Sequence, residues 1–172
     1  MKKVLLLLVV ILVLGGCSMS AKETPPLPNL NFNGNISVTY NDFDLLCKID
    51  NKLTSGCTIT VVEPELISGL KMVVSSDNCT LSMGDISYDV GSPVFKNSEF
   101  ATELSETFEQ ILTTTNVQKL ENGNWLYSGN TSSGRFNLVQ DNLTGFPVSV
   151  TIPDVGLYIK FSNMKSDQNN GG

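Results

Sequence analysis

Apolar and polar residues alternate along most of residues 31–165, in short segments separated by turn-forming residues. Alternation with a period of two predicts β-strands that have one covered face and one solvated face. Four successive hairpins are predicted in this way, at residues 43–64, 72–83, 125–139 and 148–161. The last is the most regular, because apolar positions alternate on both sides of a Pro-Asp-Val-Gly turn.

The position assumed for each turn predicts a register for its hairpin. We expect a turn near Lys52, a tight Asp77-Asn78 turn in the second hairpin and a four-residue loop in the third. The residues then predicted to face each other are Cys47–Cys57, Leu45–Ile59, Val74–Leu81, Met72–Met83, Tyr127–Phe136, Trp125–Leu138, Val148–Phe161, Val150–Ile159 and Ile152–Leu157.

One segment departs from this alternation, because residues 98–115 carry apolar residues at helical spacing. The predicted apolar stripe is Phe100, Leu104, Phe108, Ile111 and Leu112, with a solvated face made by Glu99, Glu103, Glu106 and Glu109. A shorter helical turn is predicted after Pro64. Together these elements predict an α+β fold, in which a single curved antiparallel sheet carries one main helix on its apolar face.

The first 16 residues have the features of a targeting segment. Lys2 and Lys3 precede 11 apolar residues, a run too short for the roughly 20 residues of a membrane-spanning helix. This pattern is typical of a secretory signal peptide. The sequence Leu-Gly-Gly-Cys at 14–17 resembles the bacterial lipobox, which implies cleavage before Cys17 and attachment of acyl chains to it. The alternative is an ordinary signal peptide with an incidental cysteine.

These features predict four regions. Residues 1–16 are the lipoprotein signal peptide, and residues 17–30 are the lipidated cysteine and a Pro-rich tether. Residues 31–165 form the folded domain, and residues 166–172 are a polar tail that we expect to be disordered. The acyl anchor would hold the chain on the extracytoplasmic side of a cell membrane. In a cell with two membranes, Ser18 after the lipidated cysteine favours the outer membrane.

Charge and the absence of histidine exclude several functions. Without Lys2 and Lys3, nine basic and 17 acidic residues remain, so the net charge after cleavage is about −8. An acidic chain with a single arginine, Arg135, argues against nucleic-acid binding. The lack of histidine excludes Ser-His-Asp and Cys-His catalysis and His-ligated zinc. The carboxylates form no recognisable catalytic pair, so we expect neither enzyme activity nor a cofactor or metal.

Three cysteines remain besides Cys17, and an odd number permits at most one disulfide within the chain. Cys47 and Cys57 are predicted to face each other on adjacent strands, within the Cα range of a disulfide. An extracytoplasmic location permits their oxidation. Cys79 is expected to be exposed at a tight turn. The alternative is that all three cysteines are small, buried hydrophobic residues.

Two short motifs and the order of the elements indicate a family. The motifs are P-x-x-x-x-G-L, at Pro64, Gly69 and Leu70, and D-x-x-T-G-x-P, at Asp141, Thr144, Gly145 and Pro147. With the stretches WLYSG and GLYIKFSN, they resemble the LolA-like envelope lipoproteins, relatives of the outer-membrane lipoprotein carrier. The resemblance covers most of residues 31–165. It implies an unclosed half-barrel whose concave face holds helices and an apolar cavity for acyl chains.

The chain departs from the carrier in two respects. The carrier is soluble and has a helix before its first strands, whereas here a Pro-rich segment leads into the first strand. An arginine near the carrier's cavity helps to hold its client, whereas Arg135 is predicted on the face away from Phe136. The resemblance therefore carries over the fold and an apolar cavity, but not the carrier's release mechanism.

Two functions fit these observations. The first is binding of an acyl chain, a lipid or a lipoprotein between sheet and helix. The second is an interaction with another envelope protein, without a small ligand. An apolar inward face is also what any sheet needs for a core, so only a measured void separates a cavity from a core. The candidate lining is Leu45, Ile59, Val61, Met72, Val74, Leu81, Met83, Trp125, Tyr127, Phe136, Leu138, Val150 and Ile159.

Overall fold

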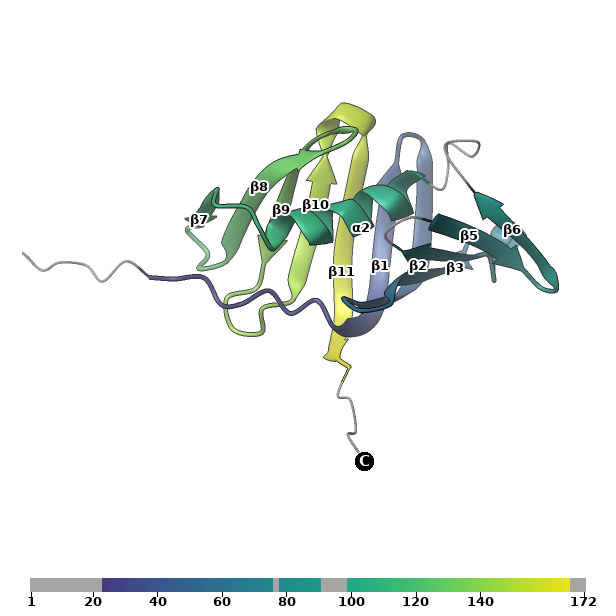
Figure 1. Cartoon of the computed structure of the whole chain (residues 1–172), viewed down its shortest axis with the longest axis horizontal. Helices are drawn as coiled ribbons and strands as arrows, with labels where there is room; N and C mark the ends of the chain where they lie inside the picture. Colours follow the sequence, from purple (N-terminus) through teal and green to yellow (C-terminus); the bar gives the residue numbers. More distant parts are fainter. Residues whose placement is uncertain (1–22, 76–77, 91–98, 168–172) are drawn as a thin grey trace, which may run out of the picture.

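The computed structural model describes residues 23–75, 78–90 and 99–167. Within these residues, eleven strands form one sheet that curls around the helix α2 (Glu99–Ile111), as Figure 1 shows. Two 3₁₀ helices, η1 (Glu65–Ile67) and η2 (Pro153–Val155), lie between strands. The strands are β1 (Phe32–Tyr40), β2 (Phe43–Lys52), β3 (Gly56–Glu63), β4 (Lys71–Ser75), β5 (Asn78–Met83), β6 (Ile86–Val90), β7 (Val117–Lys119), β8 (Trp125–Thr131), β9 (Gly134–Gln140), β10 (Pro147–Ile152) and β11 (Leu157–Ser166).

The strand order β6-β5-β4-β3-β2-β1-β11-β10-β9-β8-β7 results from two meanders. Consecutive strands pair within β1 to β6, and consecutive strands pair within β7 to β11. The meanders join where β1 pairs with β11, and the ends of the sheet stay apart at β6 and β7. The predicted fold class, a single curved antiparallel sheet with a helix on its apolar face, is confirmed.

The helix α2 lies in the concave side of the sheet and packs against β8, β4 and β3. Four members of the predicted stripe are buried: Phe100, Leu104, Phe108 and Ile111. The prediction for Leu112 is wrong, because this side chain is 53% exposed. The helix ends at Ile111, and the Leu112 N–H then donates to the carbonyl of Glu109 at 3.3 Å, which tightens the last turn and rotates Leu112 outward.

The core fills the space between the concave face and the helix. Inward residues of neighbouring strands are almost completely buried, among them Ile36, Val150 and Ile159. The ring of Phe32 makes edge-to-face contacts with three other rings, with centroids 5.7 Å away for Phe108, 6.3 Å for Phe146 and 6.1 Å for Phe161. Such pairs add about 0.5–1.5 kcal/mol each beyond burial, so this cluster holds the helix to β1 and β11.

The registers of the hairpins agree with the predictions in only one case. In β10–β11, Val150 faces Ile159 and Ile152 faces Leu157, as predicted, while Val148 lies at an irregularity and is half-buried. The other predicted facing pairs are wrong. The observed pairs are Met72–Leu81, Val74–Cys79, Tyr127–Leu138 and Trp125–Gln140. Each of these two hairpins is shifted by two residues, because the centre of the turn lies one residue earlier than assumed in β4–β5 and one residue later in β8–β9. A shift of two keeps every side chain on its predicted face.

The β2–β3 hairpin overturns the predicted disulfide. Lys52 faces Gly56 across a three-residue loop, so Cys47 faces Val61 and Cys57 faces Asn51. The two cysteines are offset by four residues, roughly 13 Å along the strands, which is beyond disulfide reach. Gly56 permits this turn, because its φ of 91° is left-handed and a Cβ there would meet the Val74 carbonyl oxygen at 2.1 Å.

All three described cysteines are free and buried, and the expected exposure of Cys79 is therefore wrong. Burial raises the pKa of the Cys47 thiol to about 12, and burial followed by the charge of Asp50 does the same for Cys57. Burial also raises the pKa of Cys79. All three are therefore protonated, small hydrophobic residues of the core, as the alternative interpretation had it.

Residues 23–30, which we call the strap, lie along the lower edge of the half-barrel in Figure 1. The Asn29 N–H donates to the Gly145 carbonyl at 2.9 Å, and the Gln140 side chain donates to the Pro26 carbonyl at 3.0 Å. The Asn51 side chain donates to the Leu30 carbonyl at 2.6 Å. These bonds join the strap to the ends of β2, β9 and β10, so this part of the Pro-rich segment is docked onto the folded domain.

Candidate functional site

An apolar pocket of about 350 Å³ lies where α2 begins, between the helix and the strands β1 to β5. This volume is at the lower end of the range for small-molecule sites. Ten of its twelve lining residues carry no charge and no hydroxyl group. The lining is Tyr40, Phe43, Asp44, Leu45, Val61, Pro64, Leu66, Ile67, Leu70, Met72, Leu81 and Phe100.

The connection between β3 and β4 forms one wall of the pocket. The Ile67 N–H donates to the Pro64 carbonyl at 3.2 Å, which closes the 3₁₀ turn η1. Two bonds then tie the far end of the turn to β3, from the Gly69 N–H to the Val61 carbonyl at 2.9 Å and from the Val61 N–H to the Leu70 carbonyl at 2.8 Å. The helical turn predicted after Pro64 is therefore confirmed, and it places Ile67 and Leu70 over the concave face.

The mouth of the pocket is apolar as well as its interior. Phe43 is 54% exposed and Leu66 is 88% exposed, although both line the pocket. Deeper in, Val61 and Phe100 are almost completely buried. The pocket therefore has an exposed apolar mouth and a buried apolar inner end beside the first turn of α2.

The few polar groups at the pocket are neutral or negative. The Tyr40 hydroxyl donates to the Glu99 carboxylate at 3.0 Å. Desolvation, this hydrogen bond and the charges of Glu99 and Glu103 raise the pKa of Tyr40 to about 12. The Asp44 carboxylate accepts a bond from the Thr39 hydroxyl at 2.7 Å. No lysine or arginine is among the described residues that line the pocket, so its electrostatics disfavour an anionic head group.

Four of the thirteen predicted lining residues line this pocket: Leu45, Val61, Met72 and Leu81. Eight others are buried in the core: Ile59, Val74, Trp125, Tyr127, Phe136, Leu138, Val150 and Ile159. Met83 lies outside the pocket and is 46% exposed. Whether any of the thirteen contacts a ligand stays a prediction.

Sequence reasoning did not predict the other eight residues that line the pocket. They are Tyr40, Phe43, Asp44, Pro64, Leu66, Ile67, Leu70 and Phe100. The P-x-x-x-x-G-L motif spans Pro64, Leu66, Ile67 and Leu70 and was the available signal for this wall. A strand pattern does not show which turn folds back over the concave face.

Of the four α2 glutamates that were predicted to form a solvated face, only Glu109 is exposed, and the other three are half-buried or buried. Glu103 is only 4% exposed and accepts a hydrogen bond from the Ser133 hydroxyl. Glu106 accepts two bonds of 2.8 Å, from the N–H and the hydroxyl of Ser132. With the Tyr40–Glu99 bond, three carboxylates fasten the helix to β1 and to the β8–β9 turn. The helix is thereby fixed beside the pocket.

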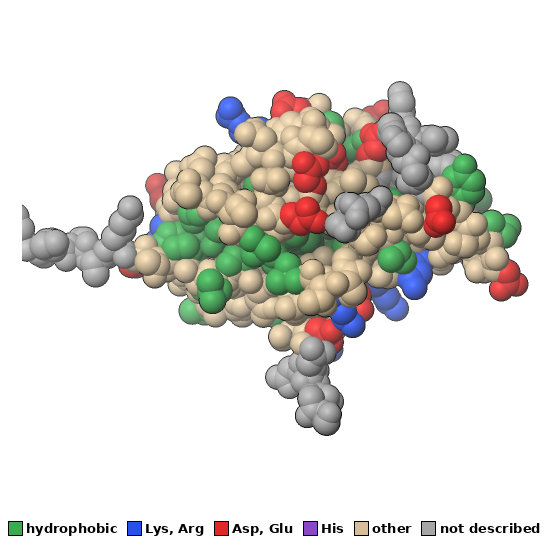
Figure 2. Space-filling model, in the orientation of Figure 1, with side chains coloured by type: hydrophobic (Ala, Val, Ile, Leu, Met, Phe, Trp, Pro, Cys, Tyr) green, Lys and Arg blue, Asp and Glu red, His purple; other side chains and the backbone are tan. Residues whose placement is uncertain are grey.

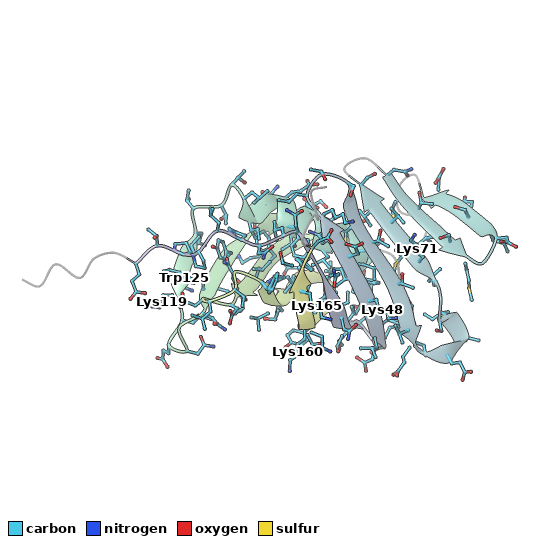
Figure 3. All side chains as sticks on the ribbon, turned by 90° about the horizontal axis from the view of Figure 1, so that it is seen from below. Lys48, Lys71, Lys119, Trp125, Lys160 and Lys165 are labelled. Carbon is cyan, nitrogen blue, oxygen red and sulfur yellow. The ribbon has the colours of Figure 1, made fainter. Side chains whose placement is uncertain are left out.

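The convex face of the sheet is polar and carries most of the cations. Figure 3 marks Lys48, Lys71, Lys160 and Lys165, none of which forms an ion pair within the described residues. A polar hollow of about 410 Å³ lies between Lys48 and Lys165 and is lined mainly by amides and hydroxyls. The convex face is therefore chemically unlike the apolar pocket on the other side of the sheet.

Comparisons with known proteins found similarity only at the level of structure. No family model and no curated protein matches the chain. The chain is similar to the crystal structure of an uncharacterised conserved protein from Thermus thermophilus, with a TM-score of 0.51 and 11% identity over 80% of each chain. It is also similar to the LolA superfamily protein NE2245 from Nitrosomonas europaea, with a TM-score of 0.46 and 12% identity over 81% of this chain and 87% of the other.

At these identities the first likeness supports the fold alone, and a TM-score below 0.5 is too low to establish a shared fold. In the part of the chain that the structure describes, no helix has the length and apolar character needed to cross a membrane. The same residues contain no group of three or more potential ligand side chains arranged for a metal ion.

Proposed function

We propose that this chain is a membrane-anchored, extracytoplasmic lipoprotein that binds an acyl chain of a lipid or lipoprotein in the pocket beside α2. The observation that carries the proposal is the 350 Å³ apolar pocket, which the core leaves open. Without an apolar ligand, the apolar side chains at the mouth of the pocket are exposed to water. The leader and the Leu-Gly-Gly-Cys sequence support the anchor, and both lie outside the described residues.

The energy available from such a pocket is sufficient for specific binding. Burying a methylene group contributes about 0.8 kcal/mol, so ten buried methylenes would contribute roughly 8 kcal/mol before the costs of association. Losses of translational and rotational freedom reduce this sum, and micromolar affinity or weaker is the expected range. The chain would therefore exchange its ligand instead of holding it permanently.

The charges at the mouth select among lipids. Asp44 lies in the lining, and Glu99 is hydrogen-bonded to Tyr40. A ligand with a free carboxylate or phosphate would be repelled there, and no cation among the described lining residues compensates. We therefore infer that the occupant has a neutral or zwitterionic head group.

Binding of a neutral and an anionic probe with the same chain length tests this proposal. A soluble form with Cys17→Ser, purified without detergent, is titrated with monolaurin and with laurate and observed by native mass spectrometry. We expect uptake of one monolaurin and weaker uptake of laurate. Leu81→Trp should abolish uptake by filling the pocket, whereas Ser82→Trp, whose side chain lies on the other face, should not.

A second candidate function is docking of a partner protein at the mouth, which the exposure of Phe43 and Leu66 favours. If neither probe binds, lipid binding is wrong and this alternative gains support. The anchor is tested separately, because acylation at Cys17 adds the mass of its acyl groups to the full chain and Cys17→Ser removes that mass.

A further inference from the structure

The docked strap limits how far the folded domain can lie from its proposed anchor. The first described residue of the strap is Glu23, which pairs with Lys119 at the end of β7. Only six peptide units separate it from Cys17. Six units span at most about 20–22 Å when fully extended, whatever their conformation. If Cys17 is lipidated, the end of the domain that carries the strap lies within this distance of the acyl chains.

That end of the domain exposes three leucines. Leu27 in the strap is 90% exposed, Leu143 before β10 is 89% exposed and Leu53 after β2 is 49% exposed. We call Leu27, Leu53 and Leu143 the leucine rim. Isolated exposed leucines are common on protein surfaces. These three differ because they lie at the one end of the sheet from which the chain leads to Cys17.

Hydrogen bonds bring the three segments of the rim together. The Asn29 N–H in the strap donates to the Gly145 carbonyl, two residues beyond Leu143. At the other side, the Leu53 N–H donates to the Asn31 side chain at 3.0 Å, directly after the strap. Figure 2 shows hydrophobic side chains gathered on the part of this face where the strap runs in Figure 1.

Two cations near the rim are neutralised, whereas Lys165, which faces Asn33 at this end of β11, forms no ion pair among the described residues. Lys119 pairs with Glu23 and lies 5.8 Å from the centre of the Trp125 ring, as Figure 3 illustrates. Lys52 pairs with Asp167 at 3.2 Å. The other lysines without an ion pair among the described residues, Lys48, Lys71 and Lys160, lie on the convex face. With one lysine at this end that is unpaired among the described residues, attraction to a bilayer would be mainly apolar.

We propose that the leucine rim rests in the interface of the bilayer that holds Cys17, an inference that depends on the proposed lipid anchor. It has a consequence for the pocket. The strap enters β1 at Phe32, whereas the pocket uses Tyr40 at the other end of β1. Eight residue steps of a strand span roughly 27 Å. The pocket mouth then opens away from the membrane, toward a donor or acceptor in the aqueous phase or on a partner protein.

Tryptophan reporters test this orientation. Trp125 is the only tryptophan of the chain, so Trp125→Phe gives a silent background. Leu27→Trp and Leu143→Trp then place reporters on the rim. Ile86→Trp is the matched control, because Ile86 is 77% exposed at the β6 edge of the sheet. Each lipidated full chain is inserted into vesicles of phosphatidylcholine with or without brominated acyl chains, and vesicle flotation measures anchoring. Circular dichroism checks the fold.

We expect the emission of both rim reporters to fall about twofold or more with brominated lipid, because interfacial side chains reach roughly 5–10 Å into the headgroup and acyl boundary. The emission of the control should not change. Flotation without quenching at the rim would overturn the inference and leave the anchor intact. Equal quenching of the control would also overturn it. Failure to float would refute the anchor and, with it, this inference.

Discussion

The two halves of the concave face are built from the same alternating pattern but are filled differently. Over β8 to β11 and β1, the helix side chains Leu104 and Phe108 and the ring of Phe32 are almost completely buried, and the rings of Phe32 and Phe108 are in edge-to-face contact. Over β2 to β5, a pocket of about 350 Å³ remains, and Phe100 in the first turn of α2 is the helix residue that lines it. We call these the filled half and the open half.

An apolar strand face is necessary for an apolar cavity but does not create one, since both halves have such a face and only the open half has the pocket. The cavity depends on where the helix begins and on the turn η1, which forms a wall without filling the space. A natural core is close-packed, so an unfilled apolar space of this size requires a reason beyond stability.

The largest effect is expected from Val150→Asp in the filled half. Val150 is fully buried between Leu138 and Ile159, so its replacement leaves a charge without a partner. The free energy of unfolding should fall by about 3–5 kcal/mol or more, enough to unfold the domain. Thr151→Asp is the control on the opposite face and should stay folded. Circular dichroism and urea unfolding measure both, and a stable Val150→Asp domain would contradict a filled core.

Replacement of a leucine by alanine should lower the free energy of unfolding by different amounts in the two halves. Leu138→Ala in the filled half should cost about 2–5 kcal/mol, because it opens a closed cavity. Leu45→Ala in the open half should cost about 1 kcal/mol, because Leu45 is only half-buried and already borders a void. Urea unfolding compares the two variants. Equal losses would show that the open half is packed as tightly as the filled half.

A smaller loss is expected from Gly129→Ala on β8. A Cβ at this position would lie 2.5 Å and 2.6 Å from two ring atoms of Phe136, which occupies the space above the glycine. Overpacking of this kind costs about 1–3 kcal/mol. Gly123→Ala, where nothing lies within 4 Å, should cost less than Gly129→Ala does, although its φ of 88° adds backbone strain. If Gly129→Ala leaves the free energy of unfolding unchanged, the filled half has enough free space for Phe136 to move.

The smallest effect concerns the corner next to the strap. Asp141 accepts bonds from the N–H and the hydroxyl of Thr144 and from the N–H of Leu143, and the Thr144 bonds hold its pKa below 3.8. A depressed carboxyl pKa stabilises the folded state above the unfolded-state pKa, and this stability is lost as the pH falls through the folded-state pKa.

Asp141→Asn should therefore lower the free energy of unfolding at neutral pH by about 1 kcal/mol at most, because the carboxyl is largely solvated. The difference from the unchanged chain should shrink as the pH falls below about 3.8. Urea unfolding at several pH values measures it. A difference that stays constant with pH would show that the carboxylate charge has no role at this corner.

Much of the fold could be predicted because its signals are local. The period of two located the hairpins, and the helical period over residues 98–115 located α2, with ends that differ by one residue and by four. The side of the sheet on which each side chain lies was predicted better than the residue that it faces on the neighbouring strand. Met72 faces Leu81 instead of Met83, yet Met72 and Leu81 both lie on the predicted inward face and line the pocket.

The candidate site was predicted less well, because it depends on contacts between distant segments. Leu45 and Leu81 are in the pocket, and Leu138 and Val150 are in the core, although all four belong to the same kind of alternating strand. No local pattern distinguishes them. The position of the first turn of α2 distinguishes the pocket residues from the core residues. This position is set by packing of the helix against strands that lie far away in sequence.

Side-chain direction along each strand and the presence of a helix with an apolar stripe followed from periodicity, because both depend on neighbouring residues only. Register, the burial of Cys47 and Cys57 in place of a disulfide, and the docking of the strap were decided in three dimensions. Register depends on turn geometry, such as the left-handed conformation at Gly56, and a core or a cavity depends on which distant side chains arrive to fill the space.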